Sequence, residues 1–277
     1  DSNSASLGTG LSLNFGGPAN YFIAKASSSG SWNWVEGGST YGNPWFDNVG
    51  VAVDSKNNIV ITGNFGQWVT FGNTNLTGYS GDDTFIASLS SSRTWNWVAQ
   101  AGNGSTSGDE VPYDITIDSE DDIYVTGYYC RNAQSCSSVT FGNISISGLN
   151  TYSDSAYFTW KVDSDGNTRW VMKGESVYED FGYSVAVASD GSIFATGTFC
   201  YRGNAPSNCQ TTFNGTSMLG RMAQYMVKYT QEDDTDGDGV LNSFDHCFRG
   251  ASGWTSNSST DWDEDGCQDS GEDLDDD

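Results

Sequence analysis

The stretch DNVGVAVDSKNNIVITGNFGQWVTFGNTNLTGYSGDDTFIASLSSSRTWNWVAQAG, residues 47–102, decides the fold because the chain repeats it. A second copy covers residues 110–174 and a third covers residues 180–231. Residues 1–46 hold a partial copy that lacks the opening strand, and the last copy lacks the closing tryptophan strand. Self-similarity at a period of roughly 50–70 residues is typical of an array built from one supersecondary unit.

Each complete copy contains four short apolar stretches with alternating character, which in the first are residues 51–53, 59–63, 84–87 and 95–98. Runs rich in Val, Ile, Thr and aromatic residues that are bounded by turn residues predict β-strands. Asp, Asn and Gly clusters recur between the first two stretches, at 54–58, 118–122 and 189–191, and these residue types favour tight turns. The sequence therefore predicts an all-β, β-propeller-like array of about four four-stranded blades, incomplete or open as a ring.

The core of the repeat reads AVDSKNNIVITG at residues 52–63 and TIDSEDDIYVTG at residues 116–127. In this respect residues 1–231 resemble the β-propeller repeats of secreted bacterial and archaeal proteins. The resemblance implies the fold and secretion, and it implies little about activity.

The composition changes after Gln231, and we expect a second segment over residues 232–277. This segment carries 16 of the 36 acidic residues and one basic residue, Arg249, within a chain of net charge −25. Such acidity disfavours binding to nucleic acids or anionic membranes, because phosphate groups are repelled, and it favours divalent cations. No apolar run approaches the length that membrane insertion requires.

Two calcium-binding loops are predicted in the acidic segment. Alternating carboxylates, a glycine at the sixth position and a closing carboxylate at the twelfth wrap a hard cation with oxygen ligands. The alternative is a disordered acidic tail, which does not explain where the glycines stand. The predicted Ca²⁺ ligands are Asp234, Asp236, Asp238, the Val240 carbonyl, Asn242 and Asp245 in the first loop, and Asp261, Asp263, Asp265, the Cys267 carbonyl, Asp269 and Glu272 in the second.

The pattern DTDGDGVLNSFDHC at residues 234–247 has no helical stretch on either side. It resembles thrombospondin type 3 repeats, with Asn242 where Asp is usual. The resemblance covers residues 232–277 and implies a calcium-threaded, helix-poor rod with disulfides that serves as a spacer in secreted and surface proteins.

The six cysteines fall into three sequential pairs, which are Cys130 with Cys136, Cys200 with Cys209, and Cys247 with Cys267. We expect each pair to form a disulfide that closes its own loop, as in an oxidising compartment. Reduced thiols or a metal site are the alternatives, but no CxxC spacing occurs and the one histidine is His246. Five glycosylation sequons agree with an extracellular or cell-surface location; they are Asn75, Asn103, Asn143, Asn214 and Asn257.

The residues that recur are expected to be structural. Trp34, Trp97 and Trp170 share one repeat position and should lie in the core between blades, whereas Trp45 and Trp68 do not recur and are better candidates for stacking on sugar rings. Carboxylates also recur, with Asp47, Glu110 and Asp180 at one position and Asp83 and Asp154 at another. Repetition at equivalent places favours turns or caps over a catalytic pair, and no catalytic residue is predicted.

We therefore expect a non-enzymatic, calcium-stabilised structural or adhesive protein. It would be a segment of a larger surface protein or a subunit of an extracellular assembly, in which free strand edges pair with a neighbouring copy. Other surface proteins and glycans are further expected partners. Two alternatives stay open, namely a lectin-like glycan-binding propeller and an extracellular polysaccharide-degrading enzyme.

Overall fold

The structure is a computed structural model. It describes residues 4–6, 10–14, 19–41, 49–78, 81–102, 108–132, 136, 138–147, 155–203, 205–213 and 216–229. The chain divides into two compact units, Asp1–Lys228 and Tyr229–Asp277. The predicted calcium loops and the pair Cys247 and Cys267 lie outside the described residues, so they remain predictions.

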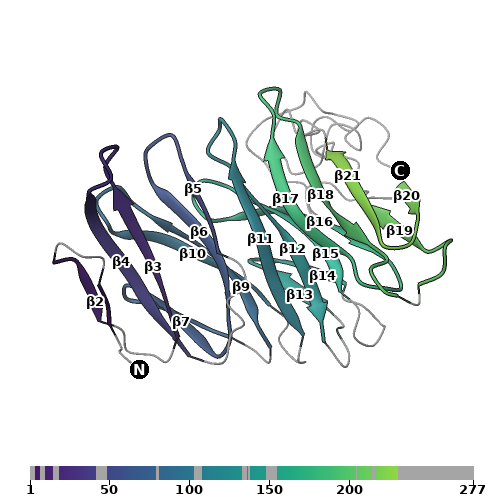
Figure 1. Ribbon diagram of the computed structural model, residues 1–277, viewed down its shortest axis with the longest axis horizontal. Helices are drawn as coiled ribbons and strands as arrows, with labels where there is room; N and C mark the ends of the chain where they lie inside the picture. The colour runs from purple at the N-terminus through teal and green to yellow at the C-terminus, as the bar shows by residue number, and fades with distance from the viewer. Residues whose placement is uncertain are drawn as a thin grey trace, which may run out of the picture. The chain divides into compact units, whose positions relative to one another are not determined.

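Every regular element among the described residues is a β-strand, as the sequence predicts (Figure 1). Every strand pairing whose register is described is antiparallel, and the described strands form five sheets. We name the four larger sheets after their first strands. In pairing order the sheets are β1 (Ser4–Ser6) and β2 (Ser12–Asn14); the β3 sheet, with β3 (Ala19–Ala26), β4 (Trp32–Tyr41), β7 (Trp68–Phe71) and β8 (Thr74–Thr77); the β5 sheet, with β5 (Gly50–Val53), β6 (Ile59–Phe65), β9 (Asp83–Leu89), β10 (Trp95–Gly102), β13 (Ser138–Phe141) and β14 (Ile144–Ser147); the β11 sheet, with β11 (Asp109–Ile117), β12 (Ile123–Arg131), β15 (Ala156–Val162), β16 (Thr168–Glu175), β19 (Gln210–Phe213) and β20 (Thr216–Leu219); and the β17 sheet, with β17 (Phe181–Val187), β18 (Ile193–Phe199) and β21 (Ala223–Tyr229).

The sheets differ in one respect from the predicted four-stranded blades. Each complete repeat supplies four strands to its own sheet, and it also forms a hairpin that joins the preceding sheet. Thus β13 and β14 belong by sequence to the β11 repeat, but β13 pairs with β10 of the β5 sheet through Ala101 opposite Phe141. In the same way, β7 of the β7–β8 hairpin pairs with β4 of the β3 sheet. One repeat further along, β19 of the β19–β20 hairpin pairs with β16 of the β11 sheet. The two middle sheets therefore have six strands.

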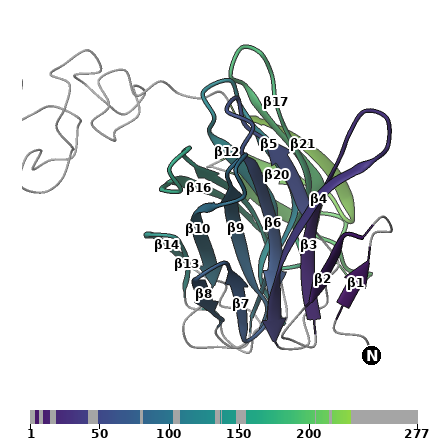
Figure 2. The same ribbon diagram turned by 90° about the vertical axis from the view of Figure 1, so that its left-hand side faces the viewer.

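The four larger sheets pack face to face, and Figure 2 views this stack from its N-terminal end, with β1 and β2 at the front beside β3. One face of β9 carries Phe85 and Ala87, which pack with Tyr21 and Ile23 of the β3 sheet. Its other face carries Ile86, which packs with residues of the β11 sheet. Every residue of β9 is buried, because a strand that is covered on both faces has no solvent side.

The last sheet shows the opposite pattern. On β21, Tyr225 and Val227 are buried while Met226 is 67% exposed, which is the alternation expected when one face is covered. Among the described strands, no pairing joins the β3 sheet to the β17 sheet, so no closed ring is seen.

Two of the three recurring tryptophans lie between sheets, as predicted. The third, Trp170, is half-buried and its ring lies 5.9 Å, between centroids, from Tyr124 of its own sheet. Trp34 and Trp97 pack against the two inter-sheet clusters. The turn after β15 fits closely on Trp97, whose Nε1 donates a 2.9 Å hydrogen bond to the Ser164 carbonyl. Gly166 in that turn has φ of 90°, and a Cβ at this position would meet the indole of Trp97.

One tryptophan changes strand between repeats while the packing is kept. The Trp95 ring on β10 lies 5.0 Å, between centroids, from Phe71 of the β7–β8 hairpin. In the next repeat Thr168 takes the place of Trp95, and Trp160 on the neighbouring strand lies 5.4 Å from the equivalent Phe141. Trp160 Nε1 donates to Thr168 Oγ1 at 3.0 Å, so the indole nitrogen keeps a partner in the core.

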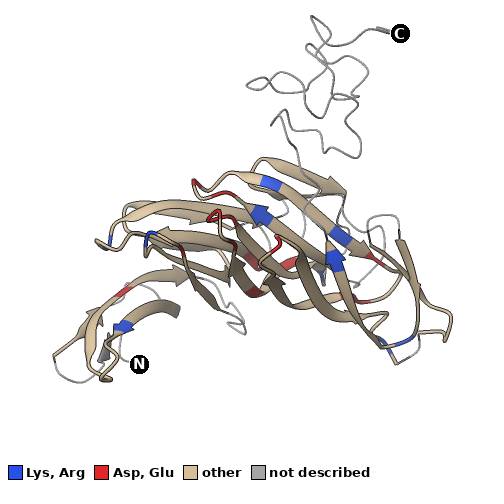
Figure 3. Cartoon of the chain, turned by 90° about the horizontal axis from the view of Figure 1, so that it is seen from above, with Lys and Arg blue, Asp and Glu red and all other residues tan. Residues whose placement is uncertain are grey.

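Charged groups make few contacts inside the array. Lys161 Nζ lies 2.8 Å from Asp122 Oδ2, and Arg169 Nε lies 3.3 Å from Asp163 Oδ2. Figure 3 shows acidic and basic segments distributed over the described strands and turns. No helix long and apolar enough to cross a membrane occurs among the described residues.

Candidate functional site

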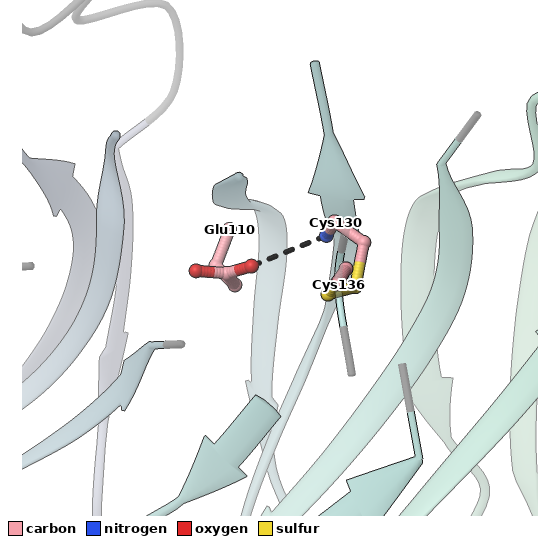
Figure 4. Close-up of side chains that lie close together, drawn as sticks. All are labelled: Glu110, Cys130 and Cys136. Carbon is pink, nitrogen blue, oxygen red and sulfur yellow. Dashed lines mark hydrogen bonds between the residues drawn. A yellow bond between two sulfur atoms is a disulfide. The ribbon is translucent and has the colours of Figure 1, made fainter. Parts of the chain in front are cut away.

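A buried carboxylate stands at the start of two successive repeats. Glu110 lies near the start of β11 and Asp180 immediately precedes β17, and both side chains are fully buried. The Cys130 backbone N–H donates to Glu110 Oε1 at 3.2 Å, and the Cys200 backbone N–H donates to Asp180 Oδ1 at 2.9 Å. Figure 4 shows the Glu110 carboxylate directed at the Cys130 nitrogen, beside the disulfide. The same contact is therefore built twice.

Two of the predicted disulfides are confirmed. Cys130 bonds Cys136 across a sequence separation of 6, and Cys200 bonds Cys209 across a separation of 9. Cys130 and Cys200 both have left-handed backbones, with φ of 63° and 51°. Residues with a Cβ rarely adopt this conformation, so it persists only where the surroundings fix it. Here the buried carboxylate holds the N–H group and the disulfide holds the side chain.

The carboxylate residues also fasten one sheet to the next. The Glu110 backbone N–H donates to the Asp82 carbonyl at 2.6 Å, and the Asp180 N–H donates to the Ser155 carbonyl at 2.8 Å. Thr84 Oγ1 donates to the Glu110 carbonyl at 2.8 Å. The predicted structural role of these two carboxylates therefore matches their contacts.

The second predicted carboxylate position needs a correction. Asp83 begins β9, and the residue at the same place in β15 is Ala156, so Asp83 and Asp154 are not equivalent. Asp83 Oδ2 accepts a 2.7 Å hydrogen bond from Gln100 Nε2 on the adjacent strand. Asp47 and Asp154 themselves lie outside the described residues.

Asp180 is tied to three separate segments. Its Oδ1 is 2.9 Å from Ser176 Oγ in the loop after β16, and its Oδ2 is 2.9 Å from Thr211 Oγ1 on β19, in addition to the Cys200 contact. Burial raises the pKa of Asp180 from 3.8 to about 7, although these hydrogen bonds oppose the rise. The carboxyl group is therefore neutral in a large fraction of molecules near pH 7.

The described residues contain one group with metal-ligand chemistry. The ligand atoms of Glu110, Cys130 and Cys136 all lie within 4.8 Å of one another. A thiolate metal site requires deprotonated, unbonded sulfurs, whereas these two sulfurs are joined in a disulfide. These donor atoms therefore do not fit a metal ion. The three residues instead fix the loop, through the Glu110 hydrogen bond and the disulfide.

The other predicted site residues divide by position. All twelve predicted calcium ligands, Trp45, and the sequons at Asn103, Asn214 and Asn257 lie outside the described residues. Asn75 on β8 and Asn143 in the β13–β14 turn are exposed, so both sequons are sterically open to modification. Trp68 is half-buried and stacks on Tyr41, with ring centroids 6.1 Å apart and planes at 8°.

The sequence reading missed a cluster of tyrosines at the edge of β11 and β17. Tyr113 and Tyr183 occupy equivalent positions in two repeats, and their ring centroids are 5.4 Å apart. A signal existed in the sequence. Asp114 lies four positions after Glu110, and Ser184 lies four positions after Asp180, whereas Gly50 lies three positions after Asp47 in the earlier copy.

Comparison with known proteins supports the repeat. A family model described as a beta-propeller repeat matches residues 96–128, which include most of β10, all of β11 and most of β12. A search of curated proteins finds no match.

Proposed function

We propose that this chain is a non-enzymatic structural or adhesive segment of an extracellular protein or assembly. In this role the repeat array would act as a rigid body, and the acidic segment would act as a calcium-stabilised spacer. The beta-propeller repeat match agrees with a structural or binding module.

The observation that carries the proposal is the use of the recurrent polar groups. Glu110 and Asp180 are buried carboxyl groups, a kind of group that can serve as a catalytic acid. Each carboxylate instead accepts a hydrogen bond from a cysteine N–H, and the backbone N–H of each residue donates to the preceding sheet. The two disulfides stiffen the same loops, and disulfides of this kind form in oxidising compartments. Because these carboxylates and disulfides make the same contacts in two repeats, they support a structural role.

Calcium enters the proposal through the sequence of residues 234–272. Binding of Ca²⁺ would neutralise clustered carboxylates and add its free energy to the folding of that segment. The calcium-bound segment would then act as a rigid spacer next to the array.

The test is a calcium titration of the full chain, followed by calorimetry and light scattering on the same sample. Binding of about two ions without a change in mass supports a calcium-rigidified spacer. Growth into large particles on binding supports an extracellular assembly of copies. An absence of binding at millimolar Ca²⁺ would overturn the calcium part of the proposal.

Matched variants separate the loops from general acidity. Asp236→Asn and Asp263→Asn each remove one predicted ligand and should each abolish about one binding event. Asp165→Asn changes an exposed carboxylate of the repeat array and should leave the titration unchanged. Equal effects of all three variants would indicate that calcium binds by net charge alone.

A further inference from the structure

The tyrosine cluster lies at two β-bulges. On β11, Pro112 pairs with Gly127 and Asp114 pairs with Thr126, so Tyr113 is the extra residue between them. On β17, Gly182 pairs with Gly197 and Ser184 pairs with Thr196, so Tyr183 is extra in the same way. A bulge redirects a side chain away from the regular alternation of the strand, and bulges are frequent next to binding sites.

Tyr183 and Tyr201 form the exposed part of a larger aromatic cluster between β11 and β17, which lie side by side in Figure 1. Tyr113 is half-buried in the same cluster. Phe181 is buried at its centre and contacts the Tyr183 ring at 6.1 Å and the Tyr201 ring at 5.9 Å. Tyr183 and Tyr201 are each 43% exposed. Two aromatic rings are thus fixed from behind and open to solvent in front.

An ion pair lies next to the buried Phe181 ring, and Asn132 follows its arginine in the chain. The Arg131 guanidinium carbon lies 5.5 Å from the Phe181 ring centroid, and Arg131 Nε lies 4.0 Å from Glu179 Oε1. Asn132 Nδ2 donates a 2.7 Å hydrogen bond to Asp109 Oδ2 in an exposed position. The guanidinium group of Arg131 can donate to hydroxyl groups, and the carboxylate of Glu179 can accept from them.

We infer that Tyr183 and Tyr201, with Tyr113, Arg131 and Glu179 around them, bind a neutral saccharide. The C–H groups on one face of a pyranose ring are weakly positive and match the negative face of an aromatic ring. The hydroxyl groups on the sugar's edge would then reach the Arg131–Glu179 pair. The bulge between Gly182 and Ser184 supplies the reason that Tyr183 faces outward, whereas Tyr201 lies after the end of β18.

The charge of the site selects the class of ligand. An anionic ligand is disfavoured by a chain of net charge −25. A cationic ligand is disfavoured locally, because Arg131 already lies over Tyr128 and Phe181 and would repel a second cation. A neutral, hydroxyl-rich ligand meets neither penalty.

The size of the patch favours a small ligand over a protein partner. With each residue 43% exposed, the two open tyrosines offer at most roughly 150–200 Å² of accessible surface. A stable protein interface needs about 800 Å² on each partner. One or two sugar rings match the smaller area. This inference does not depend on calcium. Saccharide binding can therefore fail while the proposed spacer function holds, and the spacer function can fail while saccharide binding holds.

The test is isothermal titration of the full chain with neutral hexasaccharides, using cellohexaose, laminarihexaose and chitohexaose as separate probes in the presence and absence of a calcium chelator. We expect at least one probe to bind and chelation to leave the affinity unchanged. Tyr183→Ala and Tyr201→Ala should each weaken that binding at least tenfold, with melting curves run on each variant to show that it is folded. Tyr183→Phe keeps the ring and should retain most of the affinity.

The matched control is Tyr41→Ala, since Tyr41 is 47% exposed and stacks on Trp68 at the far sheet. It should bind as the unmodified chain does. Equal weakening by Tyr41→Ala, or loss confined to it, would overturn the assignment and move the site to the Tyr41–Trp68 pair. The assignment would also be overturned if none of the three probes binds to saturation. Binding of a protein partner that is abolished by Tyr183→Ala would overturn it as well.

Discussion

The buried carboxyl group of Asp180 predicts an unusual dependence of stability on pH. Burial raises its pKa in the folded state from 3.8 to about 7. Between these values the folded chain holds a proton that the unfolded chain has released. The stabilisation is therefore complete below about pH 4 and is lost as the pH rises through 7.

The change Asp180→Asn isolates this contribution. The asparagine amide resembles the neutral acid, because its Nδ2 can donate to Thr211 Oγ1 while its oxygen accepts from the Cys200 N–H, and it does not titrate. A pKa rise from 3.8 to about 7 corresponds to roughly 4 kcal/mol, since a tenfold change in proton affinity is worth about 1.4 kcal/mol. We expect the variant to match the wild type at pH 4 and to exceed it at pH 8 by up to this amount, or roughly 10 °C in melting temperature.

The assay is urea unfolding followed by tryptophan fluorescence at pH 4, 6 and 8, with calcium held constant. Asp190→Asn serves as a control of opposite sign, because hydrogen bonds from Ser192 lower the pKa of Asp190. The Asp190→Asn variant should therefore be less stable than wild type near neutral pH, and this difference should shrink on acidification as the wild-type carboxylate becomes protonated. A difference between Asp180→Asn and wild type that does not change with pH, or that grows towards acid, would refute the reasoning.

Two further predictions follow from the contacts. Replacing Cys200 and Cys209 by serine opens a loop with a sequence separation of 9 and should lower the unfolding free energy by roughly 2–3 kcal/mol, measured by denaturant unfolding with and without reductant; an unchanged midpoint would contradict this. Trp160→Ala removes a fully buried indole and should cost about 3–5 kcal/mol, whereas Trp32→Ala, at 42% exposure, should cost far less; equal melting temperatures would show that the Trp160 packing is not needed.

Local features of the sequence predicted local structure well. The Asp54 turn was predicted from its residue types, and Asp54 Oδ1 accepts the Lys56 and Asn58 N–H groups at 2.9 and 2.7 Å. The two confirmed disulfides were predicted because their partners are close in sequence. In each case the interacting residues lie within ten positions, so composition and spacing carry the necessary information.

Features that join distant residues could not be predicted in the same way. The β13–β14 hairpin has a strand pattern, but nothing local specifies that its partner is β10 of the preceding repeat. The exchange of Trp95 for Trp160 is visible only once Phe71 and Phe141 are known to be equivalent contacts. The bulged tyrosines were missed because one extra residue inside a strand does not interrupt the residue types that predict the strand.

Each of the last three repeats contributes a hairpin to the preceding sheet, and this arrangement determines how the array unfolds. If the β11 repeat unfolds, the β5 sheet loses β13 and β14 as well as the face that packs on it. Neighbouring repeats are thus coupled through shared hydrogen bonds and not only through apolar contact. In an Ising-like description this raises the interfacial energy relative to the intrinsic energy of one repeat. Denaturation should therefore be one cooperative transition across the sheets, with no stable fragment obtained by cutting between repeats.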